Sequence, residues 1–210
     1  MGKCIIIAPL YAGEEQAWLS KEPDDLLICA DGGYAAAVRY GLTPDLTIGD
    51  FDSMPENSVR GAKIVLPVHK DDTDMIVCMN EGRKRGYSEF RIAGCLGGRL
   101  DHTLANMQVL IDAAHRGERV WMCDGQNRVT ALAPGEYAIA GGELPGWKLS
   151  LLAATEHVRG LTVTGTEWEL DNADLSQRYP LGVSNEVRGD VIIRFTEGIL
   201  FLLRSTDSQA

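Results

Sequence analysis

Short apolar runs alternate with amphipathic segments along the first part of the chain. The apolar runs predict β-strands at residues 3–8, 26–30, 46–48, 63–66, 89–93 and 119–122. Apolar residues at helical spacing predict helices at residues 33–40, 72–85 and 101–116. The inner faces expected for the last two helices consist of Met75, Cys78 and Met79, and of Leu104, Met107 and Ile111. Strands that alternate with helices in this way are typical of a mainly parallel sheet that binds ligands at the carboxyl ends of its strands.

The pattern changes after Asp124. Glycines separate short apolar runs, such as 147–153, 161–164 and 191–196, and no long helical period follows. Such a pattern predicts antiparallel β-structure. We therefore expect an α/β domain with a mainly parallel, Rossmann-like sheet at residues 1–126 and an all-β, sandwich-like domain at residues 127–210.

Composition and charge narrow the class of function. The chain of 210 residues is 45% hydrophobic and 24% charged, which is ordinary for a globular protein. Its net charge of −10 argues against nucleic-acid binding, which needs a basic surface. No apolar run is long enough to span a membrane, and the first residues predict a strand rather than a secretory signal. The five widely spaced cysteines favour reduced, buried thiols in a cytoplasmic protein over disulfides or a zinc site.

Aspartates stand beside the predicted elements at four places along the chain. They follow the second strand, follow the third strand, and begin the second and third long helical segments: Asp31; Asp50 and Asp52; Asp71, Asp72 and Asp74; Asp101. Because the carboxyl ends of parallel strands meet at one edge of a sheet, these carboxylates are expected to share that edge. Mg²⁺ takes one or two carboxylates together with phosphate oxygens and water. The pattern therefore indicates a metal–polyphosphate site, with carboxylates left for a second metal, a cationic substrate or a substrate hydroxyl.

Each aspartate taken alone also has an ordinary structural explanation. Asp72 or Asp74 can cap the helix that follows, and Asp101 can cap the next one. Asp31 can belong to a plain turn, and residues 50–52 to a solvated loop. Four acidic turns at one sheet edge nevertheless favour a functional site over four separate structural roles.

A glycine-containing segment, residues 94–99, joins a predicted strand to a predicted helix. Its glycines allow backbone N–H groups to approach an anion, and Arg99 can hold phosphate oxygens bidentately. The segment has neither the Gly-Lys-Ser/Thr of a Walker A motif nor the GxGxxG spacing, so a tight strand-to-helix turn is the alternative. The four histidines lack a spacing suited to a metal site or an activated nucleophile, although His102 lies beside Asp101.

Several motifs resemble the thiamine pyrophosphokinase family in their order and spacing. They are Ala30-Asp31-Gly32-Gly33, Gly49-Asp50-Phe51-Asp52-Ser53, Asp71-Asp72-Thr73-Asp74 and Gly97-Gly98-Arg99-Leu100-Asp101-His102. In the second half, Gly165-Thr166-Glu167-Trp168-Glu169-Leu170 and Val183-Ser184-Asn185-Glu186 are similar to thiamine-site segments of that family. The resemblance covers nearly the whole chain.

The resemblance implies Mg²⁺-dependent transfer of diphosphate from ATP to the thiamine hydroxyl, with thiamine diphosphate and AMP as products. It also implies a homodimer in which thiamine lies between the α/β domain of one subunit and the β domain of the other. The implied catalytic residues are Asp31, Asp50, Asp52, Asp74 and Asp101, and the implied metal ligands are Asp50, Asp52 and Asp74. The residues expected at the nucleotide are Lys70, Thr73, Gly97, Gly98 and Arg99. Those expected at thiamine are Asp101, Trp168, Ser184 and Asn185, with the ring of Trp168 against the pyrimidine.

Two other functions fit part of the pattern. A metal-dependent nucleotide phosphohydrolase would use the acidic edge and the glycine segment, but it would give Trp168 and Ser184 no role. A non-catalytic thiamine- or nucleotide-binding protein would keep the pocket, although the presence of every acidic motif argues against it. Without the resemblance, Trp168 is better explained as a large hydrophobe on the surface of the β domain.

Overall fold

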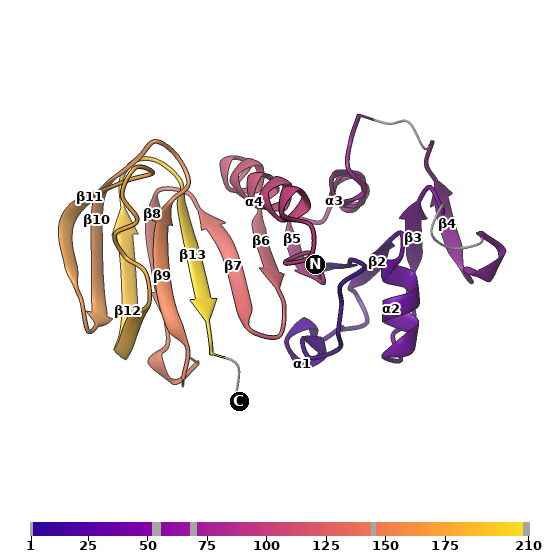
Figure 1. The fold of residues 1–210 in the computed structure, drawn as a ribbon, viewed down its shortest axis with the longest axis horizontal. Helices are drawn as coiled ribbons and strands as arrows, with labels where there is room; N and C mark the ends of the chain where they lie inside the picture. Colours follow the sequence, from indigo (N-terminus) through magenta and orange to yellow (C-terminus); the bar gives the residue numbers. More distant parts are fainter. Residues whose placement is uncertain (1, 52–55, 68–70, 144–145, 208–210) are drawn as a thin grey trace. The chain divides into compact units, whose positions relative to one another are not determined.

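The protein is described by a computed structural model that covers residues 2–51, 56–67, 71–143 and 146–207 (Figure 1). Its chain divides into two compact units. The first comprises residues 1–109 and 118–125, and the second comprises residues 110–117 and 126–210. In the described part of the chain, no helix combines the length and the apolar character needed to cross a membrane.

Strands β1 to β6 of the first unit form a parallel sheet in the order β6-β5-β1-β2-β3-β4. The bounds are β1 Cys4–Ile7, β2 Leu26–Ala30, β3 Leu46–Gly49, β4 Ala62–Val65, β5 Glu89–Ala93 and β6 Arg119–Cys123. Each bound lies within one residue of its predicted position. All four residues of β1 are buried, as expected of an apolar strand at the centre of a covered sheet.

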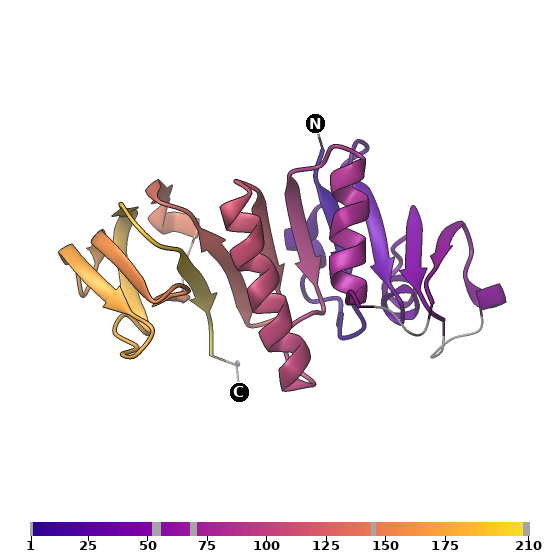
Figure 2. The same cartoon turned by 90° about the horizontal axis from the view of Figure 1, so that it is seen from above.

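Helices α2 and α3 lie on opposite faces of this sheet (Figures 1 and 2). The helices are α1 Gln16–Leu19, α2 Gly33–Arg39, α3 Asp74–Lys84 and α4 Leu100–His115, and a 3₁₀ turn, η1, spans Glu56–Ser58. Ala37 of α2 belongs to one core cluster with Ile5 and Ile7 of β1. Gly82 of α3 instead packs against Cys4 of the same strand. Because successive strand residues point to opposite faces, the two helices cover the two sides of β1.

The inner face predicted for α3 is confirmed. The one predicted for α4 is wrong at Leu104, while Met107 and Ile111 are half-buried. Met75, Cys78 and Met79 of α3 are buried, but Leu104 of α4 is 57% exposed. The buried positions of α4 are Asn106, Val109, Leu110, Ala113 and Ala114. Two of these five residues are alanines, which a hydrophobicity pattern underrates although close packing of a helix favours small side chains.

Two glycines allow close backbone contacts at the carboxyl edge of the sheet. A Cβ atom at Gly33 would lie 2.1 Å from the carbonyl oxygen of Ile7, so α2 can start this close to β1 only with glycine. Gly94 has a φ of 73°, and a Cβ atom there would lie 2.2 Å from the backbone nitrogen of Tyr11. The loop after β5 is thereby held against the loop after β1.

The strand pairs of the second unit are all antiparallel among the described residues. Its strands are β7 Asn127–Leu132, β8 Gly135–Ile139, β9 Lys148–Ala153, β10 His157–Thr166, β11 Leu170–Ser176, β12 Asn185–Phe195 and β13 Leu200–Ser205, and a 3₁₀ turn, η2, spans Gly141–Glu143. Strand β12 pairs with β9 at its start and with β8 and β10 along its length. The chain therefore combines parallel and antiparallel sheet with few helices, which agrees in outline with the predicted fold.

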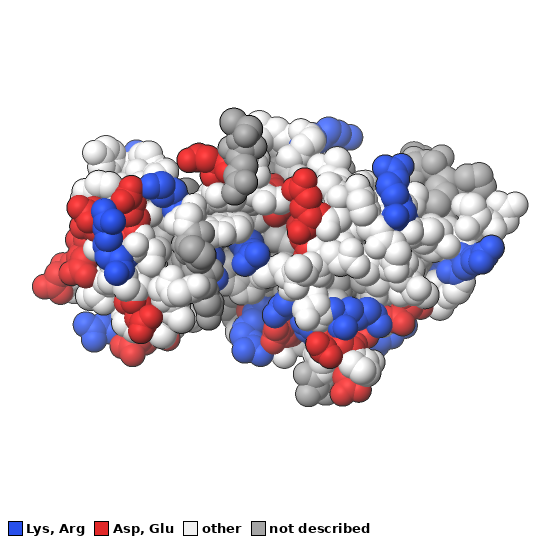
Figure 3. All heavy atoms as spheres, turned by 90° about the horizontal axis from the view of Figure 1, so that it is seen from below, with Lys and Arg blue, Asp and Glu red and all other residues white. Residues whose placement is uncertain are grey.

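Charged side chains of both signs are mixed on the face displayed in Figure 3. Two ion pairs of the first unit are mostly buried. Lys3 Nζ lies 2.5 Å from Asp25 Oδ2, and Arg83 Nη2 lies 2.7 Å from Glu118 Oε2. Because exposed pairs contribute little and the loss of a buried partner costs much, the buried pairs are the ones that matter for stability.

Glu15 is a buried carboxylate before α1 and gives the fold a pH-dependent weakness. Glu15 is 4% exposed. Burial raises the pKa of its carboxyl, and the charges of Asp124 and Glu14 raise it further. Folding therefore favours the protonated form. The contribution of Glu15 to stability is full below its unfolded pKa and is lost as the pH rises through its folded pKa.

We expect Glu15→Gln to raise the Tm by about 2–4 °C at neutral pH. The gain should disappear near about pH 3, where the wild-type carboxyl is protonated in the unfolded state as well as in the folded one. Thermal unfolding at the two pH values measures the difference in Tm between Glu15→Gln and the wild type, and the variant Glu136→Gln, at an exposed position, is the control. A Glu15→Gln variant that is less stable than the wild type at neutral pH would contradict this explanation.

Candidate functional site

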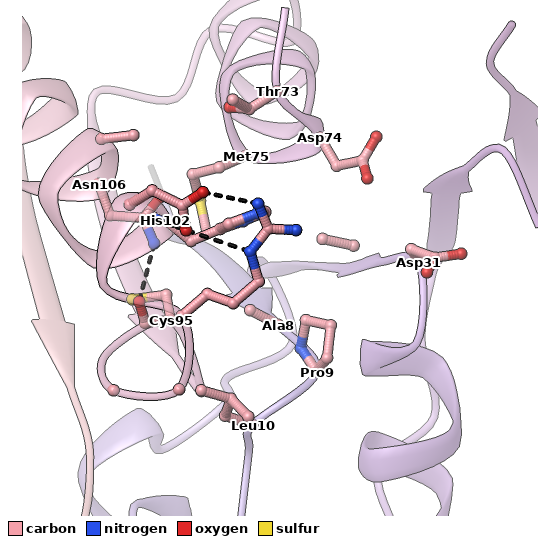
Figure 4. Close-up of a pocket in the computed structure, with 17 residues that line it drawn as sticks. Ala8, Pro9, Leu10, Asp31, Thr73, Asp74, Met75, Cys95, His102 and Asn106 are labelled. Carbon is pink, nitrogen blue, oxygen red and sulfur yellow. Dashed lines mark hydrogen bonds and ion pairs between the residues drawn. The ribbon is translucent and has the colours of Figure 1, made fainter. Parts of the chain in front are cut away.

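A cavity of about 540 Å³ lies at the carboxyl edge of the sheet of the first unit (Figure 4). Its lining comes from the ends of β1 and β2, the start of α3, the loop after β5 and the first turns of α4: residues 8–10, 30–31, 73–75, 94–95, 97–99, 101–102 and 105–106. This is the edge at which parallel sheets bind ligands, and the volume is that of a small-molecule site. The sequence predicts this position for the site.

Asp31 enters the cavity from the end of β2. Its N–H donates to the carbonyl oxygen of Ile48 at 2.7 Å, which extends the pairing of β2 with β3 by one residue. Its φ of 41° is left-handed, a conformation that aspartate adopts more readily than most residues. A Cβ atom at Gly49 would lie 2.9 Å from the Asp31 Cα, so the glycine after Ile48 makes room for this turn.

Asp74 enters the same cavity from the first turn of α3. Thr73 caps this helix, because its Oγ1 accepts a hydrogen bond from the N–H of Ile76 at 3.3 Å. The N-cap is therefore Thr73, and neither Asp72 nor Asp74 caps the helix. Thr73, which the resemblance places at the nucleotide, also lines the cavity. In Figure 4, Asp31 and Asp74 lie on the same side of the cavity.

The other predicted acidic residues are placed differently. Asp50 follows β3 directly and is partly buried, but it is not among the residues that line the cavity. Asp52 and Lys70 lie outside the described residues. Within residues 2–51, 56–67, 71–143 and 146–207, no group of three or more acidic, histidine or cysteine side chains is arranged to hold a metal ion. Besides Asp101, which pairs with Arg99, the cavity contains the carboxylates of Asp31 and Asp74. Mg²⁺ usually takes one or two carboxylates when phosphate oxygens and water complete its shell.

Arg99 and Asp101 hold each other at the cavity wall. Arg99 Nε donates to Asp101 Oδ1 at 3.1 Å and Arg99 Nη2 donates to Asp101 Oδ2 at 2.6 Å. The hydrogen bond from Arg99 lowers the pKa of Asp101, and the same bond raises the pKa of Arg99. Both side chains are largely exposed, and exposed pairs are weak because water competes for them. A phosphate oxygen can therefore replace Asp101 as the partner of Arg99.

Gly97 and Gly98 line the cavity beside this pair, with left-handed φ values of 83° and 63°. The prediction of residues at this site was incomplete. It did not single out Pro9, Leu10 or Asn106, which line the same cavity. The loop after β1 could have been found, because β1 also ends at this edge of the sheet. The signal for Asn106 was weaker and consists of one polar residue on the buried face of α4.

A second, smaller cavity of about 260 Å³ lies in the second unit and contains Trp168 and Asn185. Trp168 is 60% exposed, and the exposed Leu181 and Val183 line the same cavity. Exposed apolar side chains that gather in this way are typical of a binding surface, whereas single ones are ordinary. Asn185 fixes the backbone of Trp168: Asn185 Oδ1 accepts from the Trp168 N–H at 3.1 Å, and Nδ2 donates to the Trp168 carbonyl at 2.7 Å. Ser184 has a left-handed φ of 59° and is not among the residues that line this cavity.

Comparison with known proteins identifies both halves of the chain. The family model "Thiamin pyrophosphokinase, catalytic domain" matches residues 17–122. The model "Thiamin pyrophosphokinase, vitamin B1 binding domain" matches residues 142–200. Thiamine pyrophosphokinase of Bacillus subtilis (strain 168) is 31% identical over 204 residues, which cover 94% of this chain and 91% of that protein. Thiamine pyrophosphokinase 1 of Oryza sativa subsp. japonica is 26% identical over 194 residues, which cover 80% of this chain and 74% of that protein.

Solved structures give the same result. The crystal structure of thiamine pyrophosphokinase from Bacillus subtilis superposes with a TM-score of 0.87 at 27% identity, covering 98% of this chain and 100% of that one. The enzyme from Geobacillus thermodenitrificans superposes with a TM-score of 0.82 at 26% identity, covering 98% of each chain. These matches do not favour the phosphohydrolase or the non-catalytic binding protein. The chain belongs to the thiamine pyrophosphokinase family.

Proposed function

We propose that the cavity of the first unit binds the ATP from which this enzyme transfers a diphosphate group to thiamine. One observation carries the proposal: Asp31, Asp74, the left-handed Gly97-Gly98 pair and Arg99 line the same cavity. Together they offer carboxylates for a cation and donors for phosphate oxygens. The family gives the reaction class, and the cavity gives this chain's residues for it.

The reaction is an in-line attack of the thiamine hydroxyl on the β-phosphorus of ATP, with AMP as the leaving group. Such transfers depend mainly on positioning and on neutralising charge, with little covalent participation by the protein. The backbone N–H groups of Gly97 and Gly98 and the guanidinium of Arg99 hold phosphate oxygens. Once Arg99 has turned to a phosphate, Asp101 is available to thiamine. An aspartate of this edge accepts or orients the proton of the hydroxyl.

Asp31 and Asp74 fit the requirements of Mg²⁺, because they bring two hard oxygen donors into a cavity that also receives the polyphosphate. We assign the metal to these residues, with Asp52 and Asp50 contributing as the family resemblance implies. The bound metal neutralises charge that develops on the phosphate oxygens. Thr73 keeps α3 capped and so holds the backbone of Asp74 in place, and we assign Lys70 to the nucleotide.

The second unit supplies the thiamine site in this proposal. The exposed face of Trp168 suits both a flat pyrimidine and a cationic thiazolium ring, and the net charge of −10 favours that cation further. Asn185 holds the backbone of Trp168, and Ser184 gives the neighbouring polar edge. We assign residues 1–126 to a Rossmann-like ATP domain and 127–210 to a sandwich-like thiamine domain, which meet across a homodimer. The five buried free thiols agree with a cytoplasmic location.

Incubation of the protein with Mg·ATP and thiamine tests the proposal. We expect AMP and thiamine diphosphate in equal amounts, followed by ³¹P NMR and chromatography. ADP together with thiamine monophosphate would rule out diphosphoryl transfer, and loss of ATP without thiamine would indicate the phosphohydrolase. A parallel sample of Asp74→Asn protein reports any contaminating kinase from the preparation.

A further inference from the structure

We propose that Thr103 and Asn106 are positioning residues, which set the backbone of the Gly94–Arg99 loop so that it can receive the phosphates of the nucleotide. The inference rests on the proposed function, since it assumes that this loop binds phosphate. Neither residue is predicted to contact the reacting atoms. Both act on the loop through its backbone carbonyl groups.

The loop after β5 depends on its backbone for its shape. Gly94, Gly97 and Gly98 all have left-handed φ values, of 73°, 83° and 63°. Such glycine-rich turns have many accessible conformations in isolation, so the conformation that binds an anion must be selected by contacts. At the start of the loop, the close approach of Gly94 to the backbone of Tyr11 selects this conformation.

Two side chains of α4 hold the remaining part of the loop in this conformation. Asn106 Nδ2 donates to the carbonyl oxygen of Cys95 at 2.7 Å (Figure 4). Thr103 Oγ1 donates to the carbonyl oxygen of Gly97 at 3.0 Å. Residues three apart on a helix lie on the same side, so α4 holds the loop at two successive points. Asn106 is 9% exposed, and a buried hydrogen bond of this kind is stronger than one in water.

The contact of Thr103 also determines where a donor of the loop points. The carbonyl of Gly97 and the N–H of Gly98 belong to one planar trans peptide unit and therefore point in opposite directions. With the carbonyl turned toward Thr103, the Gly98 N–H points away from Thr103. Gly98 lines the cavity and Thr103 does not. Rotation of this peptide would replace a donor by a carbonyl oxygen, which repels phosphate.

A pair of Thr103 variants separates this role from a general effect on folding. Thr103→Val keeps the shape of the side chain and removes the donor, whereas Thr103→Ser keeps the donor. We expect Thr103→Val to raise the Kd for Mg·α,β-methylene-ATP by about threefold to tenfold, the value of one hydrogen bond. Isothermal titration calorimetry should find Thr103→Ser close to the wild type. The KM for thiamine should stay unchanged in both variants, and the Tm of Thr103→Val should fall by no more than the loss of this one hydrogen bond explains.

Asn106→Leu removes the other contact at similar volume, and it should weaken binding of the same analogue in the same direction. The exposed Gln108→Ala on the same helix is the matched control. Unchanged analogue affinity in Thr103→Val, equal loss in Thr103→Ser, or a parallel rise in the KM for thiamine would overturn the proposal. If the enzyme forms no thiamine diphosphate, the proposed function fails, while the affinity series still decides whether these side chains position the loop.

Discussion

Replacing Asp74 with asparagine is expected to lower kcat/KM for diphosphate transfer by about 10²- to 10³-fold, the loss typical of one charge-stabilising group in a preorganised site. Asp74 lies in the first turn of α3 and lines the cavity together with Asp31. Asparagine keeps the shape of the side chain and removes its charge. We expect the concentration of Mg²⁺ needed for half-maximal activity to rise as well, because the amide is a poorer ligand for a hard cation.

The fold should tolerate this substitution. Thr73 provides the cap of α3, and an acidic side chain in the first turn adds only about 0.3–1 kcal/mol through the helix dipole. Asp72→Asn is the matched control, since it changes an exposed aspartate of the same segment that does not line the cavity. Near-wild-type turnover in Asp74→Asn, or an equal loss in Asp72→Asn, would remove Asp74 from the metal-binding role.

The sequence predicts the first unit better than the second, and the reason is physical. Strands β1, β2, β3, β5 and β6 are buried at most of their positions, so the local pattern of apolar residues indicates both their type and their bounds. Short helix α1 has no such signal, because Gln16–Leu19 is a single turn that depends on tertiary contacts. In the second unit, strands such as β11, in which one residue is buried and the rest are half-buried or exposed, leave no continuous apolar run.

The location of the candidate site also follows from the sequence, whereas its internal contacts do not. Topology alone places Asp31 and Asp74 at one edge of the sheet. The hydrogen-bonded ion pair of Arg99 and Asp101 depends on side-chain orientation. Arg99 lies in a loop with left-handed glycines, and Asp101 lies in the first turn of the helix that follows. The position of Asp50 outside the cavity lining depends likewise on the backbone that follows β3. Spacing in the sequence contains no information of that kind.

Asp25→Asn is expected to destabilise the protein by about 3 kcal/mol, because it removes one partner of a buried ion pair. Asp25 Oδ2 lies 2.5 Å from Lys3 Nζ, and its oxygens also accept from the backbone N–H groups of Lys3 at 2.7 Å and Glu22 at 2.8 Å. The side chain of Asp25 is 2% exposed and that of Lys3 is 11% exposed. The single oxygen of asparagine can accept from only one of the two backbone N–H groups, so the loss should combine one backbone donor left without its acceptor with an ammonium group left without its counter-charge.

The loss should depend on pH with a definite sign. Burial raises the pKa of Asp25, but the hydrogen bonds from Lys3 and Glu22 outweigh it, and the net pKa is lowered. The stability due to Asp25 is therefore present above its unfolded pKa, near about 3.9, and is lost as the pH falls through the folded pKa. Urea unfolding at neutral and acidic pH should show the gap between wild type and Asp25→Asn closing toward acid.

Two further variants identify the cause of this loss. Asp112→Asn removes an exposed partner of Arg116 and should cost less than about 0.5 kcal/mol. Adding Lys3→Met to Asp25→Asn should recover part of the stability, because the double variant no longer buries an unpaired ammonium group. A gap that widens toward acid, or a double variant less stable than Asp25→Asn, would show that the ion pair is not what Asp25 contributes.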